Sequence, residues 1–125
     1  MPMLEPHGPS GTIDVSHDGH LWILAVRGEH DLATRPSLRH ELDKVFDAGS
    51  RCIVDFTDAK FIDSTVLRAL AYGQARAVQQ EQHSLAVVAP PGGLARRLLA
   101  LTGLDKTIPL YAARPEALAA SDENC

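Results

Sequence analysis

Three consecutive polar residues, Asp63, Ser64 and Thr65, are the best candidates for chemistry in this chain. Asp, Ser and Thr are the residue types whose side-chain oxygens cap helix N-termini. Directly behind them, apolar residues recur at spacings of three and four (Leu67, Leu70 and Ala71), which predicts a helix from Ser64 to about Gln82. Backbone N–H groups and the helix dipole favour negative charge at such a terminus. The pattern therefore predicts a serine hydroxyl presented where a phosphate can be attached without disrupting the fold.

A catalytic serine is a poor interpretation of the same residues. A hydrolase nucleophile elbow needs Gly-x-Ser-x-Gly, and Ile62 and Val66 occupy the two glycine positions around Ser64. No histidine is placed near Ser64 by sequence to act as the base. We therefore predict that the protein is not an enzyme. The simplest alternative is that Asp63, Ser64 and Thr65 only cap a helix.

Other polar motifs do not indicate a metal, cofactor or phosphate site. The six histidines are scattered, and the pair His17 and His20 has no third ligand nearby. The turn at 90–93 (PPGG) lacks the Gly-Lys-Ser/Thr ending of a phosphate loop. The two cysteines form no Cys-x-x-Cys motif, and Cys52 is expected to be a small buried hydrophobic residue. We expect neither a cofactor nor a bound metal.

The third predicted helix carries two adjacent arginines, Arg96 and Arg97, that could be taken for a phosphate grip. We assign both to a solvated helix face, because Leu94, Leu98 and Leu101 have the spacing of the buried face.

The candidate residues lie within alternating strand and helix patterns. The first two strands form a hairpin, with the turn at 17–20, and Gly28 is expected to close the second strand. Thr34 is a candidate cap for the first helix, whose apolar face is expected to comprise Leu38, Leu42, Val45 and Phe46. The expected strands are 12–16, 21–26, 52–56, 85–89 and 107–111, and the expected helices are 34–49, 64–82, 94–102 and one starting at 114–115.

These elements predict one α/β domain: a mixed β-sheet of about five strands flanked by about four helices. We divide the chain into a flexible segment (1–11), the domain (12–120) and a polar tail (121–125). Its 125 residues suit a single domain with a core.

Composition excludes several function classes. Twelve Lys and Arg against sixteen Asp and Glu give a net charge of −4, which argues against nucleic acid as a direct partner. The sequence contains no apolar run near eighteen residues and no signal peptide at its N-terminus, so we expect no membrane insertion and a cytoplasmic location.

Three segments of the chain resemble the STAS domain family, the anti-sigma factor antagonists of bacteria. Residues 51–70 (RCIVDFTDAKFIDSTVLRAL) are similar to the family's hydrophobic strand ending in Asp and its Phe-Ile/Met-Asp-Ser-Ser/Thr-Gly-Leu loop. Residues 26–34 (VRGEHDLAT) resemble the Gly-Glu-Leu-Asp-x-x-Thr segment, and residues 98–104 (LLALTGL) resemble the late helix and turn. The resemblance extends from Thr12 to Ala119 and implies a mixed sheet with helices mostly on one face.

The resemblance also implies a function. The protein would bind an anti-sigma factor that is a serine kinase, and phosphorylation at Ser64 would switch this binding off and so regulate sigma-factor-dependent transcription. A phosphoserine phosphatase is a further implied partner. The residues implied in partner binding are Asp31, Thr34, Asp63, Thr65 and Val66. Asp31 and Thr34 can equally be a strand-to-helix loop with a capping threonine. The oligomeric state stays open, with a monomer among the options.

The chain departs from the family pattern at two positions. Val66 stands where the family usually has glycine, and a β-branched side chain is expected to fill space that a partner could otherwise approach. His30 stands where the family usually has an aliphatic residue. Val66 favours an alternative function, a non-phosphorylated scaffold subunit of a larger sensory or lipid-transport assembly. A small-ligand module is a further alternative, but no motif supports it.

Overall fold

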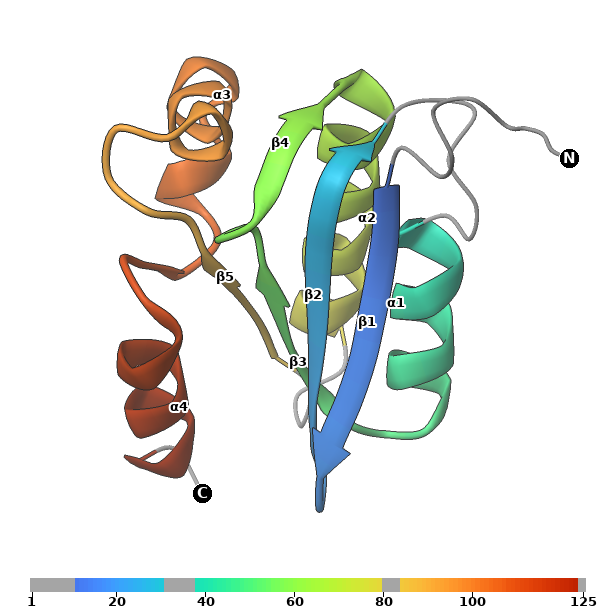
Figure 1. The fold of residues 1–125 in the computed structure, drawn as a ribbon. Helices are drawn as coiled ribbons and strands as arrows, with labels where there is room; N and C mark the ends of the chain where they lie inside the picture. Colours follow the sequence, from blue (N-terminus) through green and yellow to red (C-terminus); the bar gives the residue numbers. More distant parts are fainter. Residues whose placement is uncertain (1–10, 31–37, 80–83, 124–125) are drawn as a thin grey trace, which may run out of the picture.

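The computed structural model describes residues 11–30, 38–79 and 84–123 (Figure 1). Its strands are β1 (Gly11–Asp18), β2 (Leu21–His30), β3 (Arg51–Asp55), β4 (Ala59–Ile62), β5 (Leu85–Val88) and β6 (Leu110–Tyr111). Its helices are α1 (Leu38–Asp47), α2 (Ser64–Gln79), α3 (Leu94–Thr102), the 3₁₀ helix η1 (Leu104–Lys106) and α4 (Arg114–Glu123). The predicted α/β class is confirmed, and α4 continues three residues into the segment 121–125 that the sequence assigns to a polar tail.

The strands form one mixed sheet in the order β1-β2-β3-β5-β6, with β4 paired to β2. β1 and β2 are the predicted antiparallel hairpin, and the remaining pairs are parallel. Besides β1, β2 is long enough to pair with two further strands, one after the other along its length. Its first half pairs with β3 from Leu21 to Ala25, and its last residues pair with β4. β4 was not predicted: its four residues lie between the strand expected at 52–56 and the helix expected at 64–82, where no strand was assigned.

Gly28 does not close β2 as expected. The strand continues to His30, and its register with β4 shifts between Gly28 and Glu29. Gly28 has a positive φ of 75°, and its N–H donates to the carbonyl of Asp58 at 3.0 Å. Glycine adopts this backbone conformation without a steric penalty, so it marks an irregularity inside the strand rather than its end.

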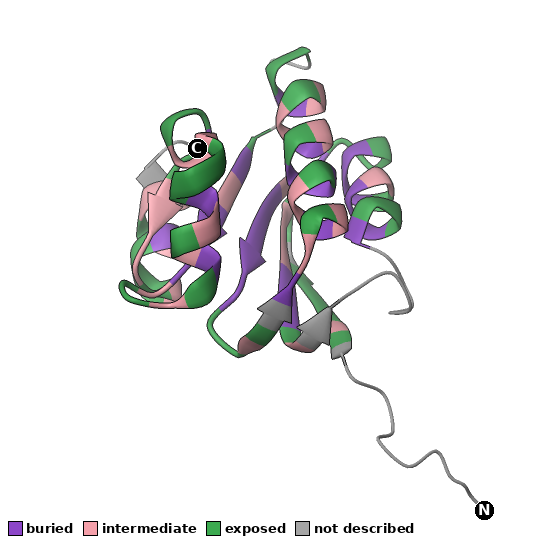
Figure 2. Ribbon diagram, turned by 90° about the horizontal axis from the view of Figure 1, so that it is seen from above, coloured by how far each residue is buried: buried purple, intermediate pink, exposed green. Residues whose placement is uncertain are grey.

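The main core lies between one face of the sheet and the helices α1, α2 and α3. Side chains alternate along β2, so that Leu24 and Val26 enter this core. The predicted α1 face is confirmed, since Leu38, Leu42, Val45 and Phe46 are all buried. The helices are exposed on their outer sides and buried toward the sheet (Figure 2).

On the opposite face of the sheet, α4 packs beside β5 (Figure 1). Ile53 of β3, Val88 of β5 and Ala117 of α4 form a smaller buried cluster there. Arg51 also donates from Nη1 to the carbonyl of Ser121 at 3.1 Å, which ties the last turns of α4 to the start of β3. The helices therefore lie mostly on one face, with a single helix on the other.

The buried faces of two helices differ from the prediction. On α3, Ala95 and Leu99 are buried, while Leu101 is 75% exposed and Leu94 is 37% exposed. On α2, the predicted face included Ala71, which is exposed. Several residues on each helix could have formed an apolar stripe, and packing against the sheet selects which of them is covered. The residues buried on α2 are Val66, Ala69, Leu70, Gly73 and Ala77.

Candidate functional site

The start of α2 is organised by Asp63, which directly follows β4. One carboxylate oxygen, Oδ1, accepts the N–H of Thr65 at 2.9 Å and the N–H of Val66 at 3.4 Å. The backbone carbonyl of Asp63 accepts the N–H groups of Val66 and Leu67 at 3.1 and 3.3 Å. Asp63 is therefore the N-cap, and Ser64 is the first helical residue, as the sequence predicts.

Ser64 and Thr65 differ in how accessible their hydroxyl groups are. Ser64 is exposed, whereas Thr65 is half-buried. The Oγ1 atom of Thr65 is itself buried and has no hydrogen-bond partner in the part of the chain that the structure describes. Of these two neighbouring hydroxyls, only that of Ser64 is open to a reacting partner.

Val66 lies in the core rather than on the surface beside Ser64. Its side chain is 6% exposed and belongs to the same buried cluster as Ile62 and Leu70. The valine therefore does not fill the space in front of the serine. This differs from the expectation drawn from the sequence. As the third residue of α2 it points toward the sheet, while Ser64 points outward.

Two exposed cations lie close to Ser64 in the sequence. Lys60 is on β4, and Arg68 follows Ser64 by four residues on α2. Within the described ranges, neither side chain makes an ion pair or a hydrogen bond. Arg68 therefore places an exposed cation with no described partner one helical turn from the Ser64 hydroxyl.

Asp31 and Thr34 lie outside the residues that the structure describes. The backbone register nevertheless shows where the preceding strand ends. His30, the last residue of β2, pairs with Ile62, the last residue of β4. The end of β2 is thereby held beside the strand that leads into Asp63 and Ser64.

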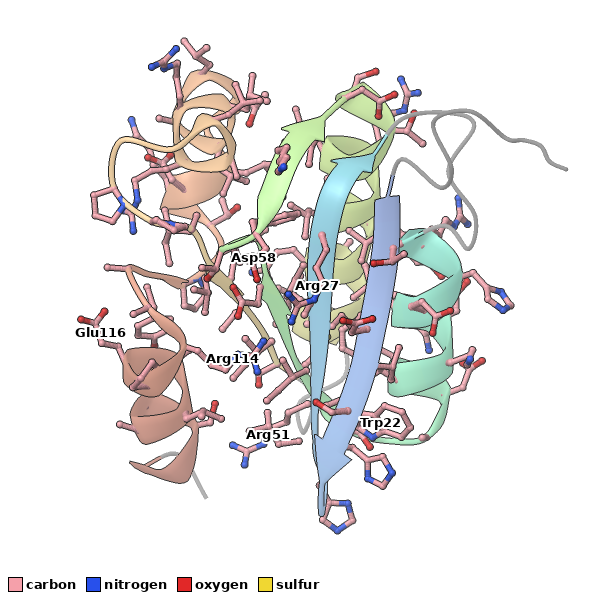
Figure 3. The ribbon with its side chains drawn as sticks, viewed as in Figure 1. Trp22, Arg27, Arg51, Asp58, Arg114 and Glu116 are labelled. Atoms are coloured by element: carbon pink, nitrogen blue, oxygen red, sulfur yellow. The ribbon has the colours of Figure 1, made fainter. Side chains whose placement is uncertain are left out.

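A second polar cluster lies at the opposite face of the sheet, and the sequence did not predict it. Arg27 of β2, Asp58 and Arg114 of α4 line a cleft of about 420 Å³ with Asp55 and Thr57 (Figure 3). Arg27 bridges Asp58, from Nη1 at 2.7 Å, and Asp14, from Nε at 2.6 Å. The only signal in the sequence was an aspartate at the end of the apolar strand β3.

Asp55 anchors this second cluster from a buried position. It is 4% exposed, and Oδ2 accepts from Arg114 Nε at 2.8 Å. Oδ1 accepts from the backbone N–H and the hydroxyl of Thr57. Burial acts to raise the pKa of Asp55, but the hydrogen bonds from Thr57 and the charge of Arg114 outweigh it, so the pKa is lowered. The carboxylate is ionised and fully engaged within the fold.

The two arginines on α3 also differ from expectation. Arg96 is half-buried and donates from Nε to the carbonyl of Ala89 at 2.9 Å, so its assignment to a solvated face was wrong. This bond satisfies a backbone acceptor just after β5, which explains why the side chain turns inward. Arg97 is exposed, as predicted.

Cysteine and the metal-binding residue types form no candidate site among the described residues. Burial raises the pKa of the Cys52 thiol, which favours its inert protonated form. No three His, Cys, Asp or Glu side chains come together to hold a metal ion within residues 11–30, 38–79 and 84–123. In the same ranges, every helix is too short or too polar to cross a membrane.

With this geometry established, comparison with known proteins identifies the family. The family model described as "Mlab, STAS domain" matches residues 13–112, most of the chain. The chain belongs to the STAS domain family. The matched range contains the three motif segments as well as the start of α2.

Relatives of this STAS protein include named regulators. The anti-sigma-F factor antagonist RsfB of Mycobacterium tuberculosis is 29% identical over 108 residues, covering 86% of each chain. The crystal structure of an anti-sigma factor antagonist from Mycobacterium paratuberculosis has a TM-score of 0.74 at 29% identity, covering 90% of this chain and 95% of the other. These relatives are regulatory binding proteins, in agreement with the prediction that the chain is not an enzyme.

A more distant protein has a similar fold. The phosphorylated form of the Bacillus cell fate determinant SpoIIAA has a TM-score of 0.67 at 14% identity, covering 88% of this chain and 99% of the other. At this identity the likeness concerns the fold alone. It confirms the STAS architecture that the resemblance implied.

Proposed function

We propose that this STAS protein is an anti-sigma factor antagonist that acts in the cytoplasm. It binds an anti-sigma factor that is also a serine kinase, and phosphorylation of Ser64 switches this binding off. The observation that carries the proposal is the exposed Ser64 hydroxyl at the capped start of α2. Support comes from the relatives, which are named as anti-sigma factor antagonists. A phosphoserine phosphatase would reverse the modification.

The contact surface of this proposal is built around Ser64. Asp63 orients the serine by capping the helix, and Thr65 contributes its exposed atoms beside it. Asp31 and Thr34 contribute from the segment that follows β2. Val66 acts from the core, where it holds the first turn of α2 against the sheet.

The physical mechanism is a change of charge at the interface. A phosphate adds about −1.5 to −2 charges to the serine. This charge lies directly beside the carboxylate of Asp63, where a bound partner would bury it. Repulsion and desolvation of about 3 kcal/mol would weaken binding roughly a hundredfold. The cap and the helix dipole keep the fold itself intact.

The proposal is tested first by phosphorylation. The protein is incubated with ATP and each anti-sigma kinase encoded in its source genome, and its intact mass is measured. We expect one added phosphate that maps to Ser64 and is absent in Ser64→Ala. Thr65→Val is the matched control, because its buried hydroxyl predicts unchanged phosphorylation.

Binding provides the second test. Calorimetric titration with the same kinase should give similar affinities for the wild type and Ser64→Ala, and an affinity roughly a hundredfold lower for the phosphorylated protein. Ser64→Asp should show a smaller loss because it adds one charge. Equal binding by all four forms would refute the switch.

The alternative is a scaffold subunit in which Ser64 is never phosphorylated. In the sequence, this alternative is favoured by Val66, which is expected to fill space beside the serine. The buried position of Val66 removes that argument. A kinase that binds the protein tightly and transfers no phosphate would restore the scaffold interpretation.

A further inference from the structure

Arg68 is separated from Ser64 by one turn of α2, and both residues are exposed. On a helix surface, residues four positions apart are neighbours, about 5–6 Å between their Cβ atoms. Three other arginines, Arg27, Arg76 and Arg114, form ion pairs. Arg68 has no ion pair or hydrogen bond among the described residues. It is a free guanidinium at the edge of the proposed phosphorylation site.

We propose that Arg68 pairs with the phosphate on Ser64 within the same molecule. The inference rests on the proposed function, since it concerns the modified serine. An anion that precedes a cation by four residues is the favoured order for an ion pair on a helix. The planar guanidinium can also donate two parallel hydrogen bonds to phosphate oxygens, which a lysine cannot do.

The start of α2 has few other donors to offer. The N–H groups of Thr65 and Val66 already donate to the carboxylate of Asp63, and that of Leu67 donates to its carbonyl. A phosphate on Ser64 therefore cannot use these groups without breaking the cap. A side-chain cation one turn away supplies the hydrogen bonds that the helix terminus does not.

This pairing changes how the switch works. In the unmodified protein, Arg68 is a cation available to an acidic side chain of the partner. Phosphorylation occupies the guanidinium from within and leaves a surface that is less positive by about two charges. The partner then loses an attractive contact in addition to meeting the repulsion near Asp63.

The test is a phosphate titration that needs no kinase. Phosphoserine is incorporated at position 64 during translation, and its ³¹P NMR shift is followed against pH in the wild type and in Arg68→Gln. The second phosphate ionisation is ordinarily near pH 6. A paired cation favours the dianion, so we expect the wild-type pKa to be lower than that of Arg68→Gln by about 0.5 or more.

Arg97→Gln is the matched control, because Arg97 is an exposed arginine on α3 and the substitution removes the same charge. It should titrate like the wild type. The other charged groups beside the serine in sequence, Lys60 and Asp63, are unchanged in every variant. Circular dichroism checks that each variant is folded.

Equal pKa values in the wild type and Arg68→Gln would overturn the proposal. So would an equal rise in Arg97→Gln, because the effect would then come from net charge rather than from a contact. The proposed function fails separately, if no kinase modifies Ser64. The titration does not depend on that result, since the phosphoserine is introduced without a kinase.

Discussion

The start of α2 and the cleft beside α4 are both polar, but their charges are satisfied in opposite ways. In the cleft, Arg27 and Arg114 are each held by carboxylates at 2.6–2.8 Å. At the start of α2, Asp63 binds the backbone, and the hydroxyl of Ser64 and the guanidinium of Arg68 remain exposed.

The difference shows that a cleft lined with charged residues can consist of groups that already pair with one another within the fold. The cleft has more charged groups and a volume of about 420 Å³, yet its pairs connect β2, β3 and α4. Their net charge is close to zero, so they offer little attraction to a charged ligand. The proposed site is instead the start of α2, where Ser64 and Arg68 are both exposed and Arg68 has no ion pair or hydrogen bond among the described residues.

The largest expected effect comes from altering Val66, the buried residue in the first turn of α2. Val66→Gly removes a side chain that is 6% exposed and places glycine in a helix. We expect a loss of about 2–3 kcal/mol in the free energy of unfolding. Urea denaturation measures it. Ser64→Ala, two residues away, should change stability by less than about 0.5 kcal/mol, and a similar loss in both variants would contradict the division of roles.

The cleft is tested by a pair of aspartates with different burial. Asp55→Asn weakens the bonds to Arg114 and Thr57, and should cost about 1–3 kcal/mol. Asp58→Asn removes a partner whose side chain is 57% exposed, and should cost about 0.5 kcal/mol or less. Urea denaturation of both variants gives the comparison. Equal costs would mean that burial does not distinguish the two carboxylates.

Removing the helix cap should have an intermediate effect at the start of α2. Asp63→Ala loses the acceptor for the N–H groups of Thr65 and Val66, and should destabilise the protein by about 1 kcal/mol. Asp63→Ser keeps a capping oxygen and should recover most of this loss. Thermal denaturation of the three proteins checks the order, and a serine variant no better than alanine would argue against capping.

The smallest expected effect is a dependence of stability on acid pH. Because the pKa of Asp55 is lowered in the folded protein, the unfolded chain binds a proton first as the pH falls. The carboxylate therefore contributes its full stabilisation above about pH 4 and loses it as the pH falls through the folded pKa. Unfolding free energies between about pH 5 and about pH 2.5 should fall less steeply in Asp55→Asn than in the wild type. Parallel curves would show that Asp55 contributes nothing to the slope.

The sequence predicted some buried faces and not others for a physical reason. On α1 one apolar stripe is flanked by charged residues, so only one face can enter the core, and Leu38, Leu42, Val45 and Phe46 do so. On α3 leucines occur around most of the helix. Packing then decided which were buried, and Leu101 was left 75% exposed. β4 was missed because a four-residue strand containing Lys60 has too little pattern to be distinguished from a turn.

The candidate site was likewise predicted only in its local part. A helix cap involves residues that are close together in the sequence, so Asp63 and Ser64 could be identified from a short segment. The inward position of Val66 was not, because the sequence alone did not show which side of the first turn faces the sheet. The roles of Ser64 and its neighbours in binding a partner remain predictions.

The amino-acid sequence alone predicts the α/β class, the order of most elements and the capped helix start at Ser64. These features follow from hydrophobic periodicity and backbone hydrogen bonding between near neighbours. Long-range packing is what exposes Ser64, buries Val66 and brings Arg114 to Asp55, 59 residues away along the chain. Such outcomes depend on which distant elements pack together, and no short stretch of sequence contains that information.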